Sequence, residues 1–141
     1  MPIDPSRLRP FLGTTLDRTN FAFLGEKYEG KVRDVYMPND RERILIATDR
    51  QSAFDKMWTT IPLKGQVLTQ ISGWWFEQIK DVMPTHVLSL SDPNVMIAKN
   101  LQMLRVEIVV RGYLTGSTST SAWVNYNNGV RNLCGNALPN G

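Results

Sequence analysis

The sequence of 141 residues contains one cysteine and one histidine, Cys134 and His86. A single cysteine excludes an intramolecular disulfide and a cysteine-based zinc site, and a single histidine excludes a histidine cluster. Any bound metal ion would therefore need oxygen ligands. Because Cys134 has no evident base partner in the sequence, a packed structural role is favoured over a nucleophilic one.

Long apolar runs and targeting signals are also missing. No stretch approaches the roughly 20 apolar residues that span a bilayer, and the first residues, MPIDPSRLRPFLG, lack the apolar core of a secretory signal. We therefore expect a cytoplasmic protein that contacts no membrane. The 16 basic and 13 acidic residues give a net charge of +3 without a polybasic run. This balance suits an anionic small molecule as well as nucleic acid, and we expect no nucleic acid partner.

Two common phosphate-binding glycine motifs are absent as well. The sequence contains neither G-x-x-x-x-G-K-[ST] nor G-x-G-x-x-G, which excludes a Walker loop and a Rossmann fingerprint. The composition is otherwise ordinary, with 42% hydrophobic and 21% charged residues, and differs from that of disordered chains. The length is sufficient for one domain with a real core.

Local patterns predict a mainly antiparallel sheet. The first 20 residues carry three prolines, which predicts a lead-in with at most one short helix. Residues 21–49 alternate strand residues with turn residues, so we expect an antiparallel meander with a bend at Gly30 and a turn at residues 37–40. Three further β-rich segments are expected at residues 85–90, 95–101 and 105–114.

Two helices are expected. Residues 64–79 have apolar side chains at the spacing of an amphipathic helix that packs one stripe on a sheet. Trp74 and Trp75 belong to this stripe, so we expect them in the core or an interface rather than in a base-stacking platform. Residues 121–129 predict a short helix after a Ser/Thr-rich entry, with Gly129 at its end.

The predicted fold class is therefore α+β, an antiparallel β-sheet with one long helix packed against a face. We expect a lead-in over residues 1–20, a β-rich lobe over residues 21–112 and the start of a second lobe over residues 113–141. The last residues, NLCGNALPNG, are rich in turn residues and predict no closing helix or strand.

The stretch GKVRDVY, Gly30–Tyr36, places two cations close together after a glycine. As a strand it would direct Lys31 and Arg33 to one face and Asp34 to the other. One interpretation is a solvated strand edge whose charges prevent aggregation. The other is a glycine turn whose backbone approaches a polyphosphate while Lys31 and Arg33 neutralise its charge. The stretch alone leaves both interpretations open.

A second cluster follows an apolar strand, where loops often carry functional residues. Within ATDRQSAFD the residues of interest are Asp49, Arg50, Ser52 and Asp55. They suit an ordinary turn that satisfies local backbone donors as well as a functional loop. Lys64 then precedes the long predicted helix, where a cation opposes the helix dipole, and this conflict indicates a use for Lys64.

A third cluster is VEIVVRGYLTGSTSTSAW, in which Glu107 and Arg111 would share one strand face. Arg111 leads into a glycine-bounded segment full of hydroxyls before a predicted helix, an arrangement that presents N–H and hydroxyl groups to a phosphate. The alternative is an internal pair of Glu107 with Arg111 followed by an ordinary N-cap. Both interpretations stay open on the residues alone.

The order and spacing of several stretches resemble those of the phosphoribosylaminoimidazole-succinocarboxamide synthase family, also called SAICAR synthetases. The resemblance runs from about residue 25 to the last residue. The stretches that carry it are GKVRDVY, ATDRQSAFD, IPLKGQVLTQIS, VEIVVRGYLTGSTSTSAW and GVRNLCGNALPNG. Their combination is far more specific than any single motif.

The resemblance implies an N-terminal, mainly antiparallel lobe over an ATP site, similar to that of the protein kinases, followed by a larger α/β lobe. Residues 21–112 would then be the ATP-binding lobe. Members of the family use ATP and Mg²⁺ to join carboxyaminoimidazole ribonucleotide to L-aspartate. The implied mechanism activates the imidazole carboxylate with the γ-phosphoryl group, and positioning and charge neutralisation would do most of the work.

The resemblance also implies roles for individual positions. ATP would be bound at its phosphates by Gly30, Lys31 and Arg33, and at its adenine by Lys99, Leu101 and Met103. The ribonucleotide would be bound by Ser52, Arg111, Gly116 and Ser117. Asp55 and Glu107 would be the catalytic acids, and no metal ligand is assigned.

Members of the family continue well beyond the length of this sequence, and the acidic segments expected to hold Mg²⁺ are not within it. The resemblance therefore implies that this chain alone binds nucleotide weakly and is inactive. We expect the surface left by the missing lobe to be covered by self-association. The alternative is a stand-alone nucleotide-binding module without catalysis.

Overall fold

The computed structural model describes residues 4–54, 56–106, 108, 110 and 112–140. The chain forms two compact units, Met1–Gln102 and Met103–Gly141, each with its own internal structure. The lobe expected over residues 21–112 extends past the end of the first unit, because residues 103–112 group with the second one.

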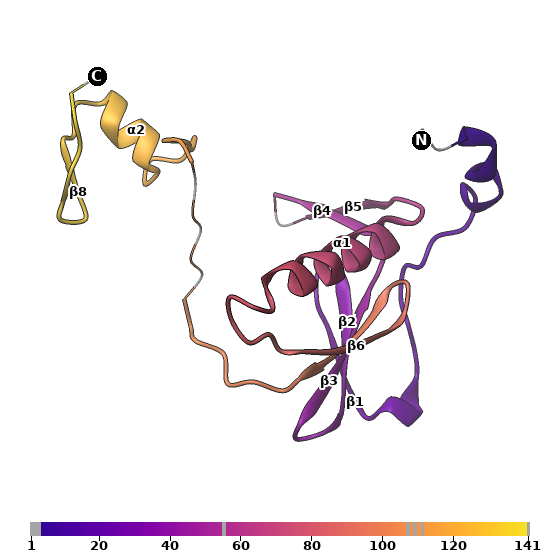
Figure 1. The fold of residues 1–141 in the computed structure, drawn as a ribbon. Helices are drawn as coiled ribbons and strands as arrows, with labels where there is room; N and C mark the ends of the chain where they lie inside the picture. Colours follow the sequence, from indigo (N-terminus) through magenta and orange to yellow (C-terminus); the bar gives the residue numbers. More distant parts are fainter. Residues whose placement is uncertain (1–3, 55, 107, 109, 111, 141) are drawn as a thin grey trace. The chain divides into compact units, whose positions relative to one another are not determined.

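The first unit is built on a five-stranded antiparallel sheet with the strand order β1-β2-β3-β7-β6 (Figure 1). The strands are β1 Glu26–Glu29, β2 Arg33–Asn39, β3 Glu42–Ala47, β6 Val87–Asp92 and β7 Val95–Lys99. The predicted meander and the two later β segments at residues 85–90 and 95–101 are confirmed. The α+β fold class is confirmed as well.

Short elements surround this sheet. Three 3₁₀ turns precede it: η1 Pro5–Arg7, η2 Arg9–Phe11 and η3 Ala22–Leu24. The prediction of at most one short helix in the first 20 residues is therefore wrong, since two separate turns form there, each with a proline at its first or second position. After β3 the chain forms a hairpin of β4 Arg50–Ala53 and β5 Lys56–Thr60.

Helix α1, Lys64–Ile79, has the predicted boundaries and packs against β3, β6 and β7 (Figure 1). It contacts the sheet by its small residues rather than by its apolar stripe. Gly65 and Thr69 are the buried residues of the helix, and a Cβ atom on Gly73 would lie 2.3 Å from Leu90 Cδ1. These positions are spaced by four residues, so they share one helix face.

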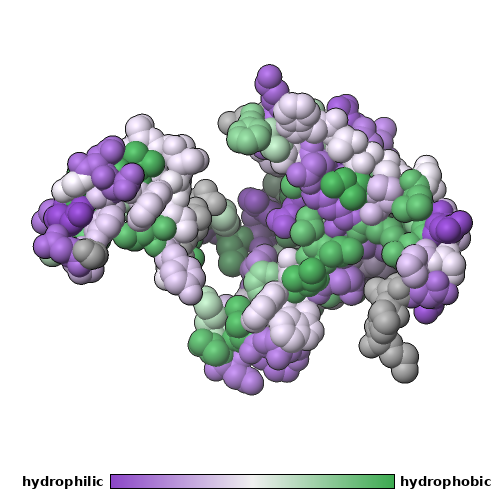
Figure 2. Space-filling model, turned by 90° about the horizontal axis from the view of Figure 1, so that it is seen from above, coloured by the Kyte–Doolittle hydropathy of each residue, from purple (hydrophilic) through white to green (hydrophobic). Residues whose placement is uncertain are grey.

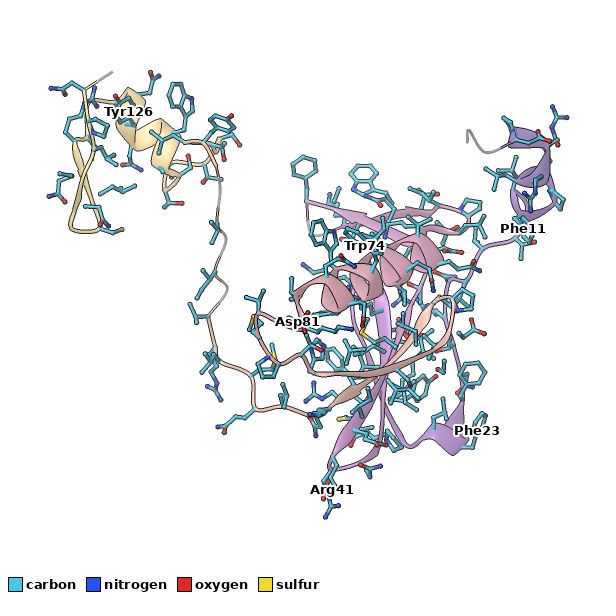
Figure 3. All side chains as sticks on the ribbon, viewed as in Figure 1. Phe11, Phe23, Arg41, Trp74, Asp81 and Tyr126 are labelled. Carbon is cyan, nitrogen blue, oxygen red and sulfur yellow. The ribbon has the colours of Figure 1, made fainter. Side chains whose placement is uncertain are left out.

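The apolar stripe of α1 is consequently exposed. Trp74 and Trp75 are 56% and 57% exposed, and Trp74 projects from the side of the helix turned away from the sheet (Figure 3). Apolar residues also appear on the face of the first unit seen in Figure 2. The tryptophans are therefore not in the core of this unit, because the helix lies too close to the sheet for large side chains to fit between them. Their expected place in an interface stays a prediction.

The second unit contains α2, Ala122–Asn127, and a small hairpin of β8, Asn132–Leu133, with β9, Asn136–Ala137. The predicted helix at 121–129 is confirmed: Ser121 caps its N-terminus, and Gly129 follows it with a φ of +89°. Cys134 lies exposed in the hairpin turn, so the expected packed role for it is wrong.

The strand expected at residues 105–114 is not found in the part of that segment that the structure describes. A strand needs a neighbour for its backbone hydrogen bonds. The strands of the second unit, as far as it is described, are two residues long and pair with each other. The sequence pattern alone therefore predicted a strand where the described residues form none.

A buried polar group lies on one face of the sheet. The Asp34 carboxylate is fully buried and accepts hydrogen bonds from the Thr19 N–H at 2.7 Å and the Thr19 hydroxyl at 2.8 Å. Arg50, which is 3% exposed, forms an ion pair with the other Asp34 oxygen at 2.9 Å. The Tyr36 hydroxyl lies 2.9 Å from that of Thr19. These bonds fasten the lead-in segment to β2.

The surroundings of Asp34 lower its pKa. Burial by itself would raise the pKa, but the hydrogen bonds from Arg50, Thr19 and Lys27 outweigh that effect and bring it to about 2 from its ordinary value of 3.8. The charged form of Asp34 is thus favoured in the folded protein.

Acid is therefore expected to destabilise this unit through Asp34. Because the folded pKa is below the unfolded one, its contribution is fully present above pH 4 and disappears as the pH falls toward 2. We expect this group to account for a loss of about 2 kcal/mol in the free energy of unfolding over that range. Urea unfolding at several pH values measures the loss, and a ¹³C NMR titration identifies the group. An Asp34 carboxyl that titrates near 3.8 would contradict the prediction.

A second expectation concerns the contact between α1 and β3. A Cβ atom on Gly65 would lie 2.3 Å from the Ala47 carbonyl oxygen, a backbone atom. Gly65→Ala should lower the free energy of unfolding by about 2 kcal/mol, although alanine is the better helix former by about 1 kcal/mol. Urea unfolding followed by circular dichroism measures the change. Gly13→Ala is the control, since nothing lies within 4 Å of its Cβ position. Equal stability of both variants would show that the helix does not pack as described.

Candidate functional site

The loop between β1 and β2, residues 30–32, is the first part of the candidate site. It is closed by a hydrogen bond from the Gly30 N–H to the Arg33 carbonyl at 2.8 Å. A Cβ atom on Gly30 would lie 3.1 Å from that same oxygen, which leaves little room for a larger residue. The expected bend at Gly30 is therefore confirmed.

The carbonyl groups of this loop are held from one side by residues 48–50. Arg50 donates from Nη2 to the Gly30 carbonyl at 2.9 Å and from Nε to the Lys31 carbonyl at 3.0 Å. Thr48 donates to the Val32 carbonyl from both its N–H and its hydroxyl, at 3.0 and 2.9 Å. Three successive peptide groups are thus fixed by one neighbouring segment.

The two expected site residues Lys31 and Arg33 lie in different local structures. Because β2 begins only at Arg33 and the chain bends at residues 31–32, Lys31 and Arg33 do not share a strand face, and that prediction is wrong. From Arg33 onward the predicted alternation holds, since Arg33 is exposed while Asp34 and Tyr36 are buried.

Lys31 lies beside a recess of about 360 Å³ between the lead-in, the β1–β2 loop and the β4–β5 hairpin. The recess brings together three of the expected site residues: Gly30, Lys31 and Ser52. Its walls also carry charges of both signs: Asp17, Arg18, Glu29 and Arg50. Lys27 stands nearby, 3.1 Å from Asp34; burial lowers its pKa, but Asp34 and Glu29 outweigh burial and raise it.

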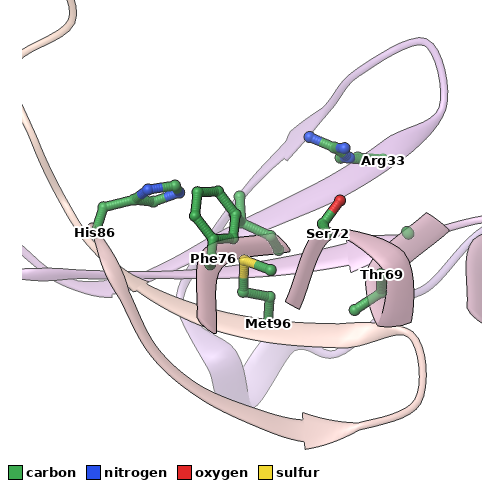
Figure 4. A pocket seen from close by; sticks show the side chains of 8 residues that line it. Arg33, Thr69, Ser72, Phe76, His86 and Met96 are labelled. Carbon is green, nitrogen blue, oxygen red and sulfur yellow. The ribbon is translucent and has the colours of Figure 1, made fainter. Parts of the chain in front are cut away.

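Arg33 lines a different cavity, of about 130 Å³, between the sheet and α1. Figure 4 shows Arg33 and the Ser72 hydroxyl toward one end, with Phe76 and His86 toward the other. The rings of Phe76 and His86 meet edge to face at 5.2 Å. Within the described part of the chain, Arg33 forms no ion pair, so its guanidinium faces the cavity without a carboxylate partner.

Asp49, from the second cluster, and Lys64, at the start of the predicted helix, organise this region. The Asp49 carboxylate accepts the Gly65 N–H at 2.9 Å and the Leu16 N–H at 2.8 Å, so it fastens the start of α1 and the lead-in. A carboxylate at this place also complements the helix dipole. Lys64 donates to the Arg50 carbonyl at 2.9 Å, which gives its unusual position a structural reason.

Arg50 was not assigned a site role from the sequence. Its only signal was a charged residue directly after the apolar run RILIATD, and that signal does not distinguish a turn from a buried ion pair.

The segment expected near adenine lies at the other end of the sheet. Lys99 pairs with Glu42, at the start of β3, whereas Arg33 pairs with Ala47, at its end. Leu101 follows β7 and is 52% exposed. Met103 is 75% exposed and belongs to the second unit.

The remaining expected residues belong to the second unit or lie outside the described residues. Gly116 and Ser117 line an open recess of about 730 Å³ before α2. Gly116 has a φ of +119°, and a Cβ atom there would lie 2.2 Å from Ser121 Cβ. The expected residues Asp55, Glu107 and Arg111 lie outside the residues that the structure describes.

The described residues contain neither a metal cluster nor a membrane span. No group of three or more His, Cys, Asp or Glu side chains among them could hold a metal ion. No helix in this part of the chain is long and apolar enough to cross a membrane.

Among curated proteins, the chain is similar to phosphoribosylaminoimidazole-succinocarboxamide synthases. It is 51% identical over 126 residues to the one from Legionella pneumophila (strain Lens), covering 89% of this chain and 40% of that protein. It is 53% identical over 118 residues to the chloroplastic one from Vigna aconitifolia, covering 84% of this chain and 34% of that protein. The chain thus spans well under half the length of these relatives.

Solved structures give the same result for the fold. A SAICAR synthase matches with a TM-score of 0.78 and 25% identity, over 89% of this chain and 49% of that one. A SAICAR synthetase of type 2 in complex with ADP matches with a TM-score of 0.62 and 26% identity, over 82% and 47% of the two chains. The sequence model of the SAICAR synthetase family matches residues 26–139, which include the β1–β2 loop, α1 and the loop before α2. The chain therefore belongs to the SAICAR synthetase family.

Proposed function

We propose that this chain is the nucleotide-binding part of an ATP-dependent ligase that joins carboxyaminoimidazole ribonucleotide to L-aspartate. The observation that carries the proposal is the family match over residues 26–139. It is supported by two solved relatives, one in complex with ADP and one, from Saccharomyces cerevisiae, complexed with SAICAR. Because the chain spans 40% of its Legionella relative, the complete reaction belongs to a longer protein.

The proposed reaction has two steps. The substrate carboxylate attacks the γ-phosphorus of ATP, which forms an acyl phosphate and releases ADP. The amine of L-aspartate then attacks the acyl carbon, a C–N bond forms, and phosphate leaves with the C–O bond electrons. Both steps develop negative charge on phosphoryl oxygens, so cations and positioning supply most of the catalysis.

In this proposal the β1–β2 loop and the start of β2 bind the phosphates. Gly30 allows close approach of the backbone, and Lys31 and Arg33 neutralise charge. An arginine that faces a cavity without an ion-pair partner among the described residues is suited to bind an anion. Lys99, Leu101 and Met103 are proposed for the adenine.

The spacing of these segments supports an elongated ligand. Arg33 and Lys99 mark opposite ends of β3, which are roughly 17 Å apart at the rise of a β-strand. The cavity beside Arg33 also reaches His86, whose carbonyl accepts the Lys99 N–H at 2.8 Å. Its 130 Å³ would hold only part of a nucleotide, since small-molecule sites have roughly 300 Å³ or more.

The substrate and catalytic roles stay proposals as well. Ser52, Arg111, Gly116 and Ser117 are proposed to bind the ribonucleotide, and Asp55 and Glu107 to act in catalysis. ATP would enter as its Mg²⁺ complex. No cluster of acidic or histidine side chains among the described residues fits the ion, so we assign no ligand for it and no step to it.

Nucleotide binding tests the phosphate role. We expect the 141-residue chain to bind Mg·ATP, and Arg33→Ala to weaken that binding about tenfold by removing a charge-assisted contact. Isothermal titration calorimetry measures both affinities. Arg9→Ala removes the same charge from the exposed turn η2, which carries none of the proposed nucleotide contacts, and should leave the affinity unchanged. An equal loss of Mg·ATP affinity in both variants would show that Arg33 acts only through the net charge of the chain.

Catalysis tests the remainder of the proposal. With ATP, Mg²⁺, L-aspartate and carboxyaminoimidazole ribonucleotide, the 141-residue chain should form no succinocarboxamide product that mass spectrometry detects. A full-length family member under the same conditions is the positive control. Product formed by the chain alone would overturn the assignment of the reaction to a longer protein.

A further inference from the structure

Arg50 is almost fully buried and forms several hydrogen bonds. It is 3% exposed, so it offers little surface to a ligand although it borders the recess beside Lys31, and its guanidinium donates to groups from three separate segments. Its partners are the carbonyls of Asp17, Gly30 and Lys31 and the carboxylate of Asp34. A planar fork of five donors is the side chain best suited to hold several acceptors in one fixed arrangement.

These bonds determine how two peptide groups of the β1–β2 loop are oriented. In a trans peptide the C=O and the following N–H point in opposite directions. Because Arg50 binds the Gly30 and Lys31 carbonyls, the N–H groups of Lys31 and Val32 are directed away from Arg50. A phosphate is attracted by N–H groups and repelled by carbonyl oxygens, so this orientation favours an anion on the far side of the loop.

The far side is the face on which Arg33 lies. Asp34 and Arg33 are neighbours in β2 and point to opposite faces of the sheet. Arg50 binds the Asp34 carboxylate at 2.9 Å, so it acts from the face opposite Arg33. The Asp34 charge also neutralises Arg50, which therefore does not compete with Arg33 for an anion.

We propose that Arg50 is a positioning residue for the phosphates of the nucleotide, because it turns the carbonyls of Gly30 and Lys31 away from the ligand face. The inference rests on the proposed function. It adds that the phosphate-binding loop is oriented by a residue whose guanidinium donors are already occupied by the loop and by Asp34. Since Arg50 begins β4, which carries Ser52, the same residue connects the loop to the hairpin proposed to bind the second substrate.

The test uses the 141-residue chain and compares Mg·ATP with adenosine, which lacks phosphates. Arg50→Gln should weaken ATP binding about tenfold in calorimetry and leave adenosine binding unchanged. Arg50→Lys should show a smaller loss, because lysine keeps the charge without the planar fork. A purely structural role would lower the two affinities alike.

A double variant separates positioning from stability. Arg50→Gln alone leaves a buried carboxylate without its ion pair and will lower the thermal midpoint. Asp34→Asn combined with Arg50→Gln removes both charges and should regain thermal stability, because the carbonyl oxygen of the introduced amide can still accept from Thr19. It should not regain ATP affinity. Recovery of ATP affinity together with stability would overturn the positioning role.

Hydrogen exchange provides a test that needs no nucleotide. In Arg50→Gln the Gly30 N–H, bonded to the Arg33 carbonyl, should exchange at least about tenfold faster, while amides in β3 and β7 keep their rates. Unchanged exchange at Gly30, with ATP binding intact, would overturn the positioning role alone. Failure of the unaltered chain to bind ATP would instead contradict the proposed function.

Discussion

The ion pair between Asp34 and Arg50 is the contact on which the arrangement of the first unit depends. Both groups are almost fully buried, so each would carry a large desolvation cost without the other. The pair is accordingly saturated with further hydrogen bonds, from Thr19 to Asp34 and from Arg50 to the β1–β2 loop. One buried pair therefore determines where the lead-in lies and how the loop is shaped.

Asp49 extends this organisation to the other side of the chain. It precedes Arg50 and holds the Gly65 N–H at the start of α1, while Lys64 returns a hydrogen bond to the Arg50 carbonyl. Two successive residues thus fix the helix and the loop together. Because α1 and β2 both line the cavity beside Arg33, these polar contacts contribute to its shape together with the apolar side chains of Leu45, Phe76 and Met96.

The sequence predicted the elements whose signals are local, and it failed where the outcome depends on packing. The ends of α1 and the strands β2, β3, β6 and β7 follow from periodicity and turn residues. The buried face of α1 could not be predicted from hydrophobicity, since close packing on the sheet favours the small residues Gly65, Thr69 and Gly73 over the tryptophans.

The β4–β5 hairpin was missed because its short strands, RQSA and KMWTT, lack a strong alternating pattern. In the site, the family resemblance supplied Lys31 and Arg33, but no local signal identified Arg50.

Arg33 and Arg50 show why the same residue type in one small region can have opposite roles. The donors of Arg50 are occupied by backbone carbonyls and by Asp34, so an anion could reach them only by breaking a buried network. Arg33 lies on the other face and has no carboxylate partner among the described residues.

The register of β2 separates the two arginines, because it places Asp34 on the face of the sheet opposite Arg33. A slip of one residue would bury Arg33 and expose Asp34 to the cavity, because side chains alternate at every step. The bend at residues 31–32, held by Thr48 and Arg50, determines where that alternation starts. The loop geometry therefore decides which cation is available to a ligand.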